Sequence, residues 1–251
     1  MRISGMGHVI FAASLIALGI LGVAENNFAP VWQPVPKGVP ARELLVYLCA
    51  LVSLSCGAAL LWPRTAAPGA KSLAGYLALW LLAFRAPDVV RAPLSQDPWS
   101  GMGEMAVYLA AAWSLVAAFT ARSARPGQVL YGLALIPFGT AHFAYINETA
   151  SLVPGWLPAH LAIAYFTGFA YIAAAAAILA GRYARLAAWL SVLQMGLFTA
   201  LVWVPIVMAG PGAFAWSEFV ISVALTTSAW VVAESYRSAR PSPGAGSSSS
   251  P

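Results

Sequence analysis

The chain has 251 residues, of which 61% are hydrophobic and 8% are charged, with a formal net charge of +5 at pH 7. A soluble globular domain carries about 25% charged residues, so this sequence cannot cover a water-facing surface, which excludes an ordinary soluble enzyme or binding domain. It also contains no nucleotide-binding loop or nucleic-acid-binding module, and nucleic acid is not an expected partner. Composition therefore predicts a protein whose main solvent is the lipid bilayer.

Eight apolar runs follow one another along the chain. A bilayer core about 30 Å thick is crossed by about 20 apolar residues of helix, and these runs are long, non-alternating and rich in Ala, Leu and Gly, which favours helices over a β-barrel. In chain order they span residues 7–24, 41–62, 71–87, 103–121, 128–147, 158–181, 184–208 and 214–236. The predicted fold class is all-α, a polytopic membrane protein with eight transmembrane helices.

The charges between these runs predict an orientation, because Lys and Arg collect on the cytoplasmic side of membrane proteins. With the N-terminus inside, nine of the thirteen basic residues are cytoplasmic, namely Arg2, Arg64, Lys71, Arg122, Arg125, Arg182, Arg185, Arg237 and Arg240. The opposite side holds Lys37, Arg42, Arg85 and Arg91, together with seven of the eight acids: Glu25, Glu43, Asp88, Asp97, Glu104, Glu148 and Glu218. Both termini are therefore expected in the cytoplasm. The net positive charge arises mostly from the excess of Lys and Arg on that side.

An internal repeat divides the chain. The pentapeptide RSARP occurs at 122–126 and again at 237–241, and other identities recur 117 or 118 residues apart: Pro40 with Pro158, Tyr47 with Tyr165, Arg64 with Arg182, Pro87 with Pro205, and Trp99 with Trp216. These matches predict two four-helix repeats, 1–126 and 127–236, and a disordered cytoplasmic tail at 237–251. Because four is an even number, both repeats cross the membrane in the same sense, as parallel-repeat bundles. Trp32 and Trp156 are expected at the membrane interface.

Ionisable side chains within or beside the runs are the candidates for function, since each costs about 2.5–3.5 kcal/mol at a helix centre. In the second repeat they gather at the outer helix ends. There, His142 can exchange a proton near neutral pH, with Glu148 or Glu218 as its acid–base partner, and these three are the candidate catalytic residues. The alternative is that water at the interface simply satisfies them. In the first repeat, Arg85 and Asp88 are placed three residues apart and can pair.

A ligand pocket is predicted at the same outer end, between the runs 128–147, 158–181 and 214–236. It suits the polar head of a lipophile such as a quinone. Its candidate lining residues are Phe138, His142, His160, Tyr165, Tyr171 and Trp203, and the corresponding residues of the first repeat are Glu25, Tyr47 and Glu104. The three histidines are scattered, so neither a metal nor a covalently bound cofactor is expected.

The second repeat resembles the DoxX family of small bacterial membrane proteins over most of residues 130–208. The resemblance rests on a Gly-x-x-His-Phe motif, a Val-Pro-x-Trp-Leu-Pro motif, a Tyr-x-x-Gly motif and an Arg-containing turn. These are carried here by Gly139, His142, Phe143, Val153, Pro154, Trp156, Leu157, Pro158, Tyr165, Gly168, Arg182 and Arg185. The first repeat departs from the pattern, with Glu25 in place of the histidine, Lys37-Gly38-Val39 between its prolines and Cys49-Ala50 in place of Thr167-Gly168.

This resemblance implies four-helix membrane bundles in the bacterial cytoplasmic (inner) membrane. It implies an accessory or scaffolding subunit of a membrane redox complex, with protein partners in that complex and a bound quinone or other lipophile. Two alternatives remain open. One is a membrane enzyme acting on a sterol-like or lipid-like substrate through a His/Glu pair, although no complete catalytic constellation is present; the other is a small-solute transporter. The duplication predicts a monomer, because two fused repeats mimic a dimer of four-helix units.

Overall fold

The computed structural model describes residues 5–210 and 212–237, and over these ranges the chain forms helices and loops without a strand. The all-α fold class is thus confirmed. The first half contains α1 (Met6–Ala24), η1 (Pro30–Trp32), α2 (Arg42–Leu61), α3 (Ala66–Trp80), η2 (Leu81–Arg85), α4 (Ala86–Arg91) and α5 (Gln96–Thr120). The second half contains α6 (Arg125–Ala144), α7 (Ile146–Ser151), α8 (His160–Ala180), α9 (Ala184–Phe198), η3 (Thr199–Trp203), α10 (Val204–Met208) and α11 (Ala213–Ser235).

Seven segments of the described chain are helical, long and apolar enough to cross a membrane. They are Met6–Ala24, Arg42–Leu61, Ala66–Arg91, Gln96–Thr120, His160–Ala180, Ala184–Met208 and Phe214–Ser235. Seven of the eight predicted spans are therefore confirmed as candidates. The remaining predicted run, 128–147, forms the 20-residue helix α6 but is not among them, because Gln128, Pro137 and His142 lower its mean hydropathy. The chain is a polytopic, all-helical membrane protein.

Two of these spans are interrupted by a π-helical turn at the same relative position. In the first half η2 joins α3 to α4, and in the second η3 joins α9 to α10; Pro87 and Pro205 lie just beyond the respective turns. Proline lacks an N–H donor and its ring collides with the preceding helical turn, so a widened turn there relieves the clash. The two turns begin 118 residues apart, which is the spacing of the sequence repeat.

A second irregularity recurs at the same spacing. Ala41 and Ala159, directly before α2 and α8, have left-handed backbone angles, with φ of 53° and 58°. This conformation costs a residue with a Cβ about 1–2 kcal/mol, and each alanine follows a proline that begins the approach to the helix. These paired features support the predicted duplication into 1–126 and 127–236, which stays a prediction. Of the predicted tail at 237–251, all but Arg237 lies outside the described residues.

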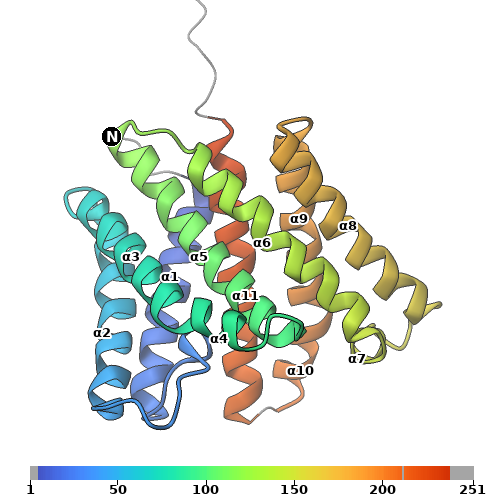
Figure 1. The fold of residues 1–251 in the computed structure, drawn as a ribbon, viewed down its shortest axis with the longest axis horizontal. Helices are drawn as coiled ribbons and strands as arrows, with labels where there is room; N and C mark the ends of the chain where they lie inside the picture. Colours follow the sequence, from blue (N-terminus) through green and yellow to red (C-terminus); the bar gives the residue numbers. More distant parts are fainter. Residues whose placement is uncertain (1–4, 211, 238–251) are drawn as a thin grey trace, which may run out of the picture.

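The helices enclose two hydrophobic cores that share α5 and α11, which lie between α1–α3 on one side and α8–α9 on the other (Figure 1). The first core combines α1, α2, α3 and α5 with Ile221, Ala224 and Val231 of α11. The second combines α6, α8, α9 and α11 with Ala106, Val107 and Ala110 of α5. The first helix of each half packs against the last helix of the other, α1 against α11 and α6 against α5. The division into two four-helix bundles stays a prediction.

Glycines bring these exchanged helices together. A Cβ on Gly7 of α1 would lie 2.7 Å from the Trp230 ring of α11, and one on Gly127 of α6 would lie 2.8 Å from the Ala110 carbonyl oxygen of α5. Small residues of this kind let helix backbones approach closely in lipid. Packing between the two halves thus depends on a glycine at each of these contacts.

The start of α1 and the end of α11 lie at the same end of the molecule (Figure 1), where Gly5 is beside the carboxylate of Glu234. The turns between α2 and α3, α5 and α6, and α8 and α9 lie at this end as well. We call it the arginine-rich end, defined by Arg64, Arg122, Arg125, Arg182, Arg185 and Arg237. The cytoplasmic assignment of this end stays a prediction from the charges.

Candidate functional site

In the first half, the loop after α1 folds back into the core. We call this segment, residues 28–35, the Trp32 plug; its buried members are Phe28, Ala29, Val31, Trp32 and Val35. Trp32 is 1% exposed and its indole N–H donates to Ser53 Oγ at 3.2 Å, while the Trp80 indole N–H donates to the Trp32 carbonyl oxygen at 3.2 Å. The Trp32 ring also meets Tyr76 edge to face, 5.5 Å between centroids. Trp32 is therefore enclosed by protein side chains, and its predicted position at the membrane interface stays a prediction.

Arg85, the last residue of η2, holds the plug from the other side. Its side chain is buried, and its guanidinium donates to the Val31 carbonyl oxygen at 3.3 Å. Gly101 faces it without a side chain, since a Cβ there would lie 3.2 Å from the guanidinium. The predicted pairing of Arg85 with Asp88 is not formed as an ion pair, because Asp88 bonds Arg91 at 2.8 Å instead.

The corresponding loop of the second half stays on the surface. No residue of α7 is buried, and Trp156 is 72% exposed. At the positions 118 residues after Ser53, Tyr76 and Trp80, the second half carries Tyr171, Gln194 and Phe198, respectively. The two halves therefore present different side chains at the level where the first half is filled by its own tryptophan.

His142 lies at this level, in the last turns of α6. Its Nδ1 bonds the Phe138 carbonyl oxygen at 2.8 Å; a carbonyl only accepts, so Nδ1 carries the proton and Nε2 is left as an acceptor. The imidazole meets the buried Tyr171 ring edge to face at 5.3 Å, and Phe138 lies 5.8 Å from the same ring. We call Phe138, His142 and Tyr171 the His142 cluster. The structure thus brings together three of the predicted pocket residues.

A glycine on α8 makes this approach possible. A Cβ on Gly168 would lie 2.9 Å from the His142 Cβ and 2.7 Å from the Phe143 ring. Phe143 in turn stacks on Tyr165, with 6.1 Å between centroids, although Tyr165 is 43% exposed. The predicted residue Tyr165 therefore lies next to the His142 cluster, on the outer face of α8.

The other predicted lining residues lie farther away. Trp203, at the end of η3, contacts Phe198 edge to face at 6.4 Å. His160 is the first residue of α8, about 12 Å from Gly168 by helical rise. The predicted first-half counterpart Tyr47 is exposed on α2. These residues do not join the His142 cluster.

The predicted carboxylates are divided between two places. Glu148 is exposed on α7. Glu218 of α11 interacts electrostatically with Glu104 of α5, which also feels the charge of Arg85, and Ser217 donates to Glu25 Oε1 at 3.2 Å. Glu25, Glu104 and Glu218 therefore lie at the central helices, while the surroundings of His142 are aromatic. The predicted acid–base pairing of His142 with Glu148 or Glu218 receives no support from this placement.

The described residues contain no group of three or more His, Cys, Asp or Glu side chains that could hold a metal ion. Comparisons with family models, curated proteins and solved structures found no match to this chain. The geometry therefore defines the class, a polytopic helical membrane protein with an aromatic–histidine cluster in one half. Sequence reasoning missed the plug and its contact with Arg85; the apolar letters of FAPVWQPV, in a loop expected to meet water, were the available signal.

Proposed function

We propose that this chain is a DoxX-like accessory or scaffolding membrane protein whose second half binds the ring of a lipophile, such as a quinone, at the His142 cluster. The observation that supports this proposal is the difference between the halves. The first half buries Trp32 of its own loop against Ser53 and Trp80. The second half keeps its loop outside and presents His142 and Tyr171 at the matching level. A ligand ring takes the role there that the Trp32 indole has in the first half.

The polar atoms of the cluster suit a quinone and its reduced form. The Tyr171 hydroxyl can donate to a quinone carbonyl, and Nε2 of His142 can accept from a quinol hydroxyl. Phe138 supplies an aromatic face, and burial of a ring of phenylalanine size contributes about 1.5–3 kcal/mol. Phe138 thus binds the ring, while His142 and Tyr171 fix its orientation. Small-molecule sites commonly combine apolar lining with a few polar groups in this way.

A binding role fits this geometry better than acid–base catalysis. The cluster contains one imidazole, and the side chains around it are aromatic rather than carboxylate. The resemblance to the DoxX family adds the expectation of protein partners in a membrane redox complex. The proposed duplication adds the expectation of a monomer, since α5 and α11 already join two four-helix units.

The test begins with the protein purified in mild detergent. Native mass spectrometry identifies any co-purified lipophile or partner, and decylubiquinone titration gives an affinity. His142→Leu removes one hydrogen bond and should weaken the affinity about tenfold, while His160→Leu, the same change at the start of α8, should leave it unchanged. Equal affinities of the wild type and His142→Leu, or a wild type that binds no quinone, would refute the proposal.

A small-solute transporter is the second candidate, and one observation favours it. Arg85 is buried inside a candidate span and interacts electrostatically with Glu104, which also faces Glu218 across the α5–α11 contact. Ionisable groups at such positions mark ion and proton pathways in membrane proteins. Proton flux in proteoliposomes tests this candidate. Flux that Glu104→Gln abolishes and Glu148→Gln preserves supports transport, and the absence of flux in the wild type rejects proton transport by this path.

A further inference from the structure

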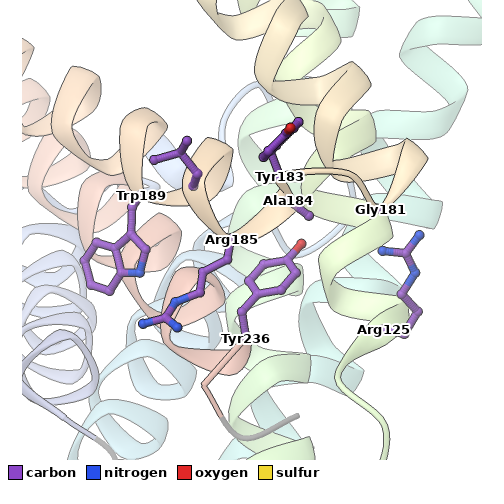
Figure 2. Close-up of a pocket in the computed structure, with 8 residues that line it drawn as sticks. Arg125, Gly181, Tyr183, Ala184, Arg185, Trp189 and Tyr236 are labelled. Atoms are coloured by element: carbon purple, nitrogen blue, oxygen red, sulfur yellow. The ribbon is translucent and has the colours of Figure 1, made fainter. Parts of the chain in front are cut away.

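A hollow of about 630 Å³ opens at the arginine-rich end, at the opposite end of α6 from His142 (Figure 2). It lies where the start of α6, the turn between α8 and α9, and the end of α11 meet. Its lining includes Arg125, Tyr183, Arg185, Leu186, Trp189 and Tyr236. The lining thus combines two cations and three aromatic rings, and no acidic residue belongs to it.

The two arginines of the lining differ in how they are held. Arg125 donates to the carbonyl oxygens of Ile178 and Leu179 at 3.3 and 3.2 Å, which fixes its guanidinium against the end of α8. Arg185 is exposed and makes no hydrogen bond to the described residues. An anion in the hollow would therefore meet one fixed charge and one guanidinium whose five donors are available.

A third cation lies at the rim. Arg237 sits over the Trp189 ring, 5.2 Å from its centroid. Glu234 interacts with Arg237, but its carboxylate also accepts the Trp230 indole N–H at 2.9 Å, and it does not line the hollow. The positive charge of the hollow is therefore only partly balanced by the protein.

Neutral donors add to these charges. The Tyr236 hydroxyl oxygen is buried and has no hydrogen-bond partner among the described residues, and Figure 2 shows this side chain between Arg185 and Arg125. Burial raises the pKa of Tyr236, so its hydroxyl keeps a proton to donate. Tyr183 and Ala184, where α9 begins, also line the hollow, and no side chain caps this helix. Its first backbone N–H groups therefore remain available to an anion.

An apolar row leaves the hollow along α9. Leu186 belongs to the lining, and Leu190, Leu193 and Leu197 follow it at helical spacing on the same face. All four are exposed, between 49% and 56%. A row of this kind in a candidate membrane span meets acyl chains, so the hollow opens directly onto the hydrocarbon region.

We infer that this hollow binds the phosphate of an anionic phospholipid, with an acyl chain along the row from Leu186 to Leu197. The arginines, the Tyr236 hydroxyl and the α9 N-terminus supply donors to the phosphate oxygens. Basic pockets between transmembrane helices bind lipid headgroups by the same chemistry. Free phosphate could use the donors alone, whereas the leucine row next to the hollow also suits an acyl chain. This inference is independent of the function proposed for the His142 cluster.

The test uses the full chain, stripped of lipid in a neutral detergent. Phosphatidylglycerol, phosphatidylcholine and inorganic phosphate are titrated separately, with binding read by native mass spectrometry and thermal unfolding. Of the three compounds, only phosphatidylglycerol should bind and raise the unfolding temperature of the protein. Arg185→Gln should weaken its binding about tenfold, through loss of a charge-assisted contact. Arg64→Gln, which removes an exposed charge from the same end but outside the hollow, should leave binding unchanged.

Three results would overturn the inference: phosphatidylcholine that binds as tightly as phosphatidylglycerol, inorganic phosphate that stabilises the protein equally, or an Arg64→Gln variant that loses as much binding as Arg185→Gln. If Arg185→Gln fails to fold, the wild-type protein is tested by photo-crosslinking. A photo-crosslinking phosphatidylglycerol should then label the segment 181–190. Labelling that spares this segment while marking other parts of the chain contradicts the site.

Discussion

The contact between α6 and α8 depends on Gly139, and Gly139→Val tests it. A Cβ at this position would lie 2.9 Å from the Gly168 carbonyl oxygen and 2.6 Å from Ile172 Cδ1. The isoleucine can rotate, but the carbonyl belongs to a helix backbone, so α6 and α8 must move apart before an ordinary contact of 3.4 Å is reached. Overpacking of this kind costs about 1–3 kcal/mol, and the two further methyl groups of valine place the expected loss at about 2–3 kcal/mol.

The free energy of unfolding in detergent micelles measures this loss. Gly75→Val in α3 is the matched control, because no atom lies within 4 Å of the Cβ it adds, and its effect should stay within about 0.5 kcal/mol. The separation also moves His142 away from Tyr171, so Gly139→Val should weaken quinone binding while the control does not. A Gly139→Val protein as stable as the Gly75→Val protein would refute the close approach of these helices.

Three further changes test buried polar contacts, each by the free energy of unfolding. Trp32→Phe removes the indole N–H that donates to Ser53 and should cost about 1–2 kcal/mol, because packing is lost with the hydrogen bond. Tyr131→Phe removes the 2.7 Å hydrogen bond to Ser191 and should cost about 1 kcal/mol. Arg85→Leu breaks a hydrogen bond from a charged group and should cost about 1.5–3 kcal/mol; chymotrypsin should then cut the released plug after Trp32.

Exposed residues of the same types provide the controls. Trp62 is 66% exposed and Tyr183 is 77% exposed, so Trp62→Phe and Tyr183→Phe should change the free energy of unfolding by less than about 0.5 kcal/mol. Losses as large as those of the buried residues would show that burial is not the cause. For Arg85→Leu, a plug that resists chymotrypsin as well as the wild type would contradict the anchoring role of the arginine.

The helices were predictable because composition alone forces the chain into lipid, where a helix satisfies its own backbone. The form of the breaks within these helices was not predictable. Pro87 and Pro205 could be read as places where a helix bends or ends, but a sequence does not say whether the preceding turn widens. The structure shows that it widens in both halves, at η2 and η3. Local sequence thus gave the position of each break, and packing decided its form.

The candidate site was predictable only as far as helical spacing reaches. Phe138 and His142 are four residues apart, so they share a face of α6, and Tyr171 follows on the next long helix. Glu218 was expected beside them because helices of one repeat were expected to close on each other. The exchange of α1 and α6 between the halves places Glu218 near Glu104 instead. Hydropathy cannot reveal which of two similar helices becomes a neighbour.

The exchange of helices between the halves has a consequence for biosynthesis. α1 (Met6–Ala24) leaves the ribosome before α11 (Ala213–Ser235), yet the two helices pack against each other. At translation rates of about 5–20 residues per second, synthesis of the intervening chain takes on the order of 10–40 s. Throughout that interval the face of α1 that carries Gly7 meets lipid or an insertion factor rather than Trp230. The nascent first half is therefore an open assembly, and the arrival of α11 completes both cores together.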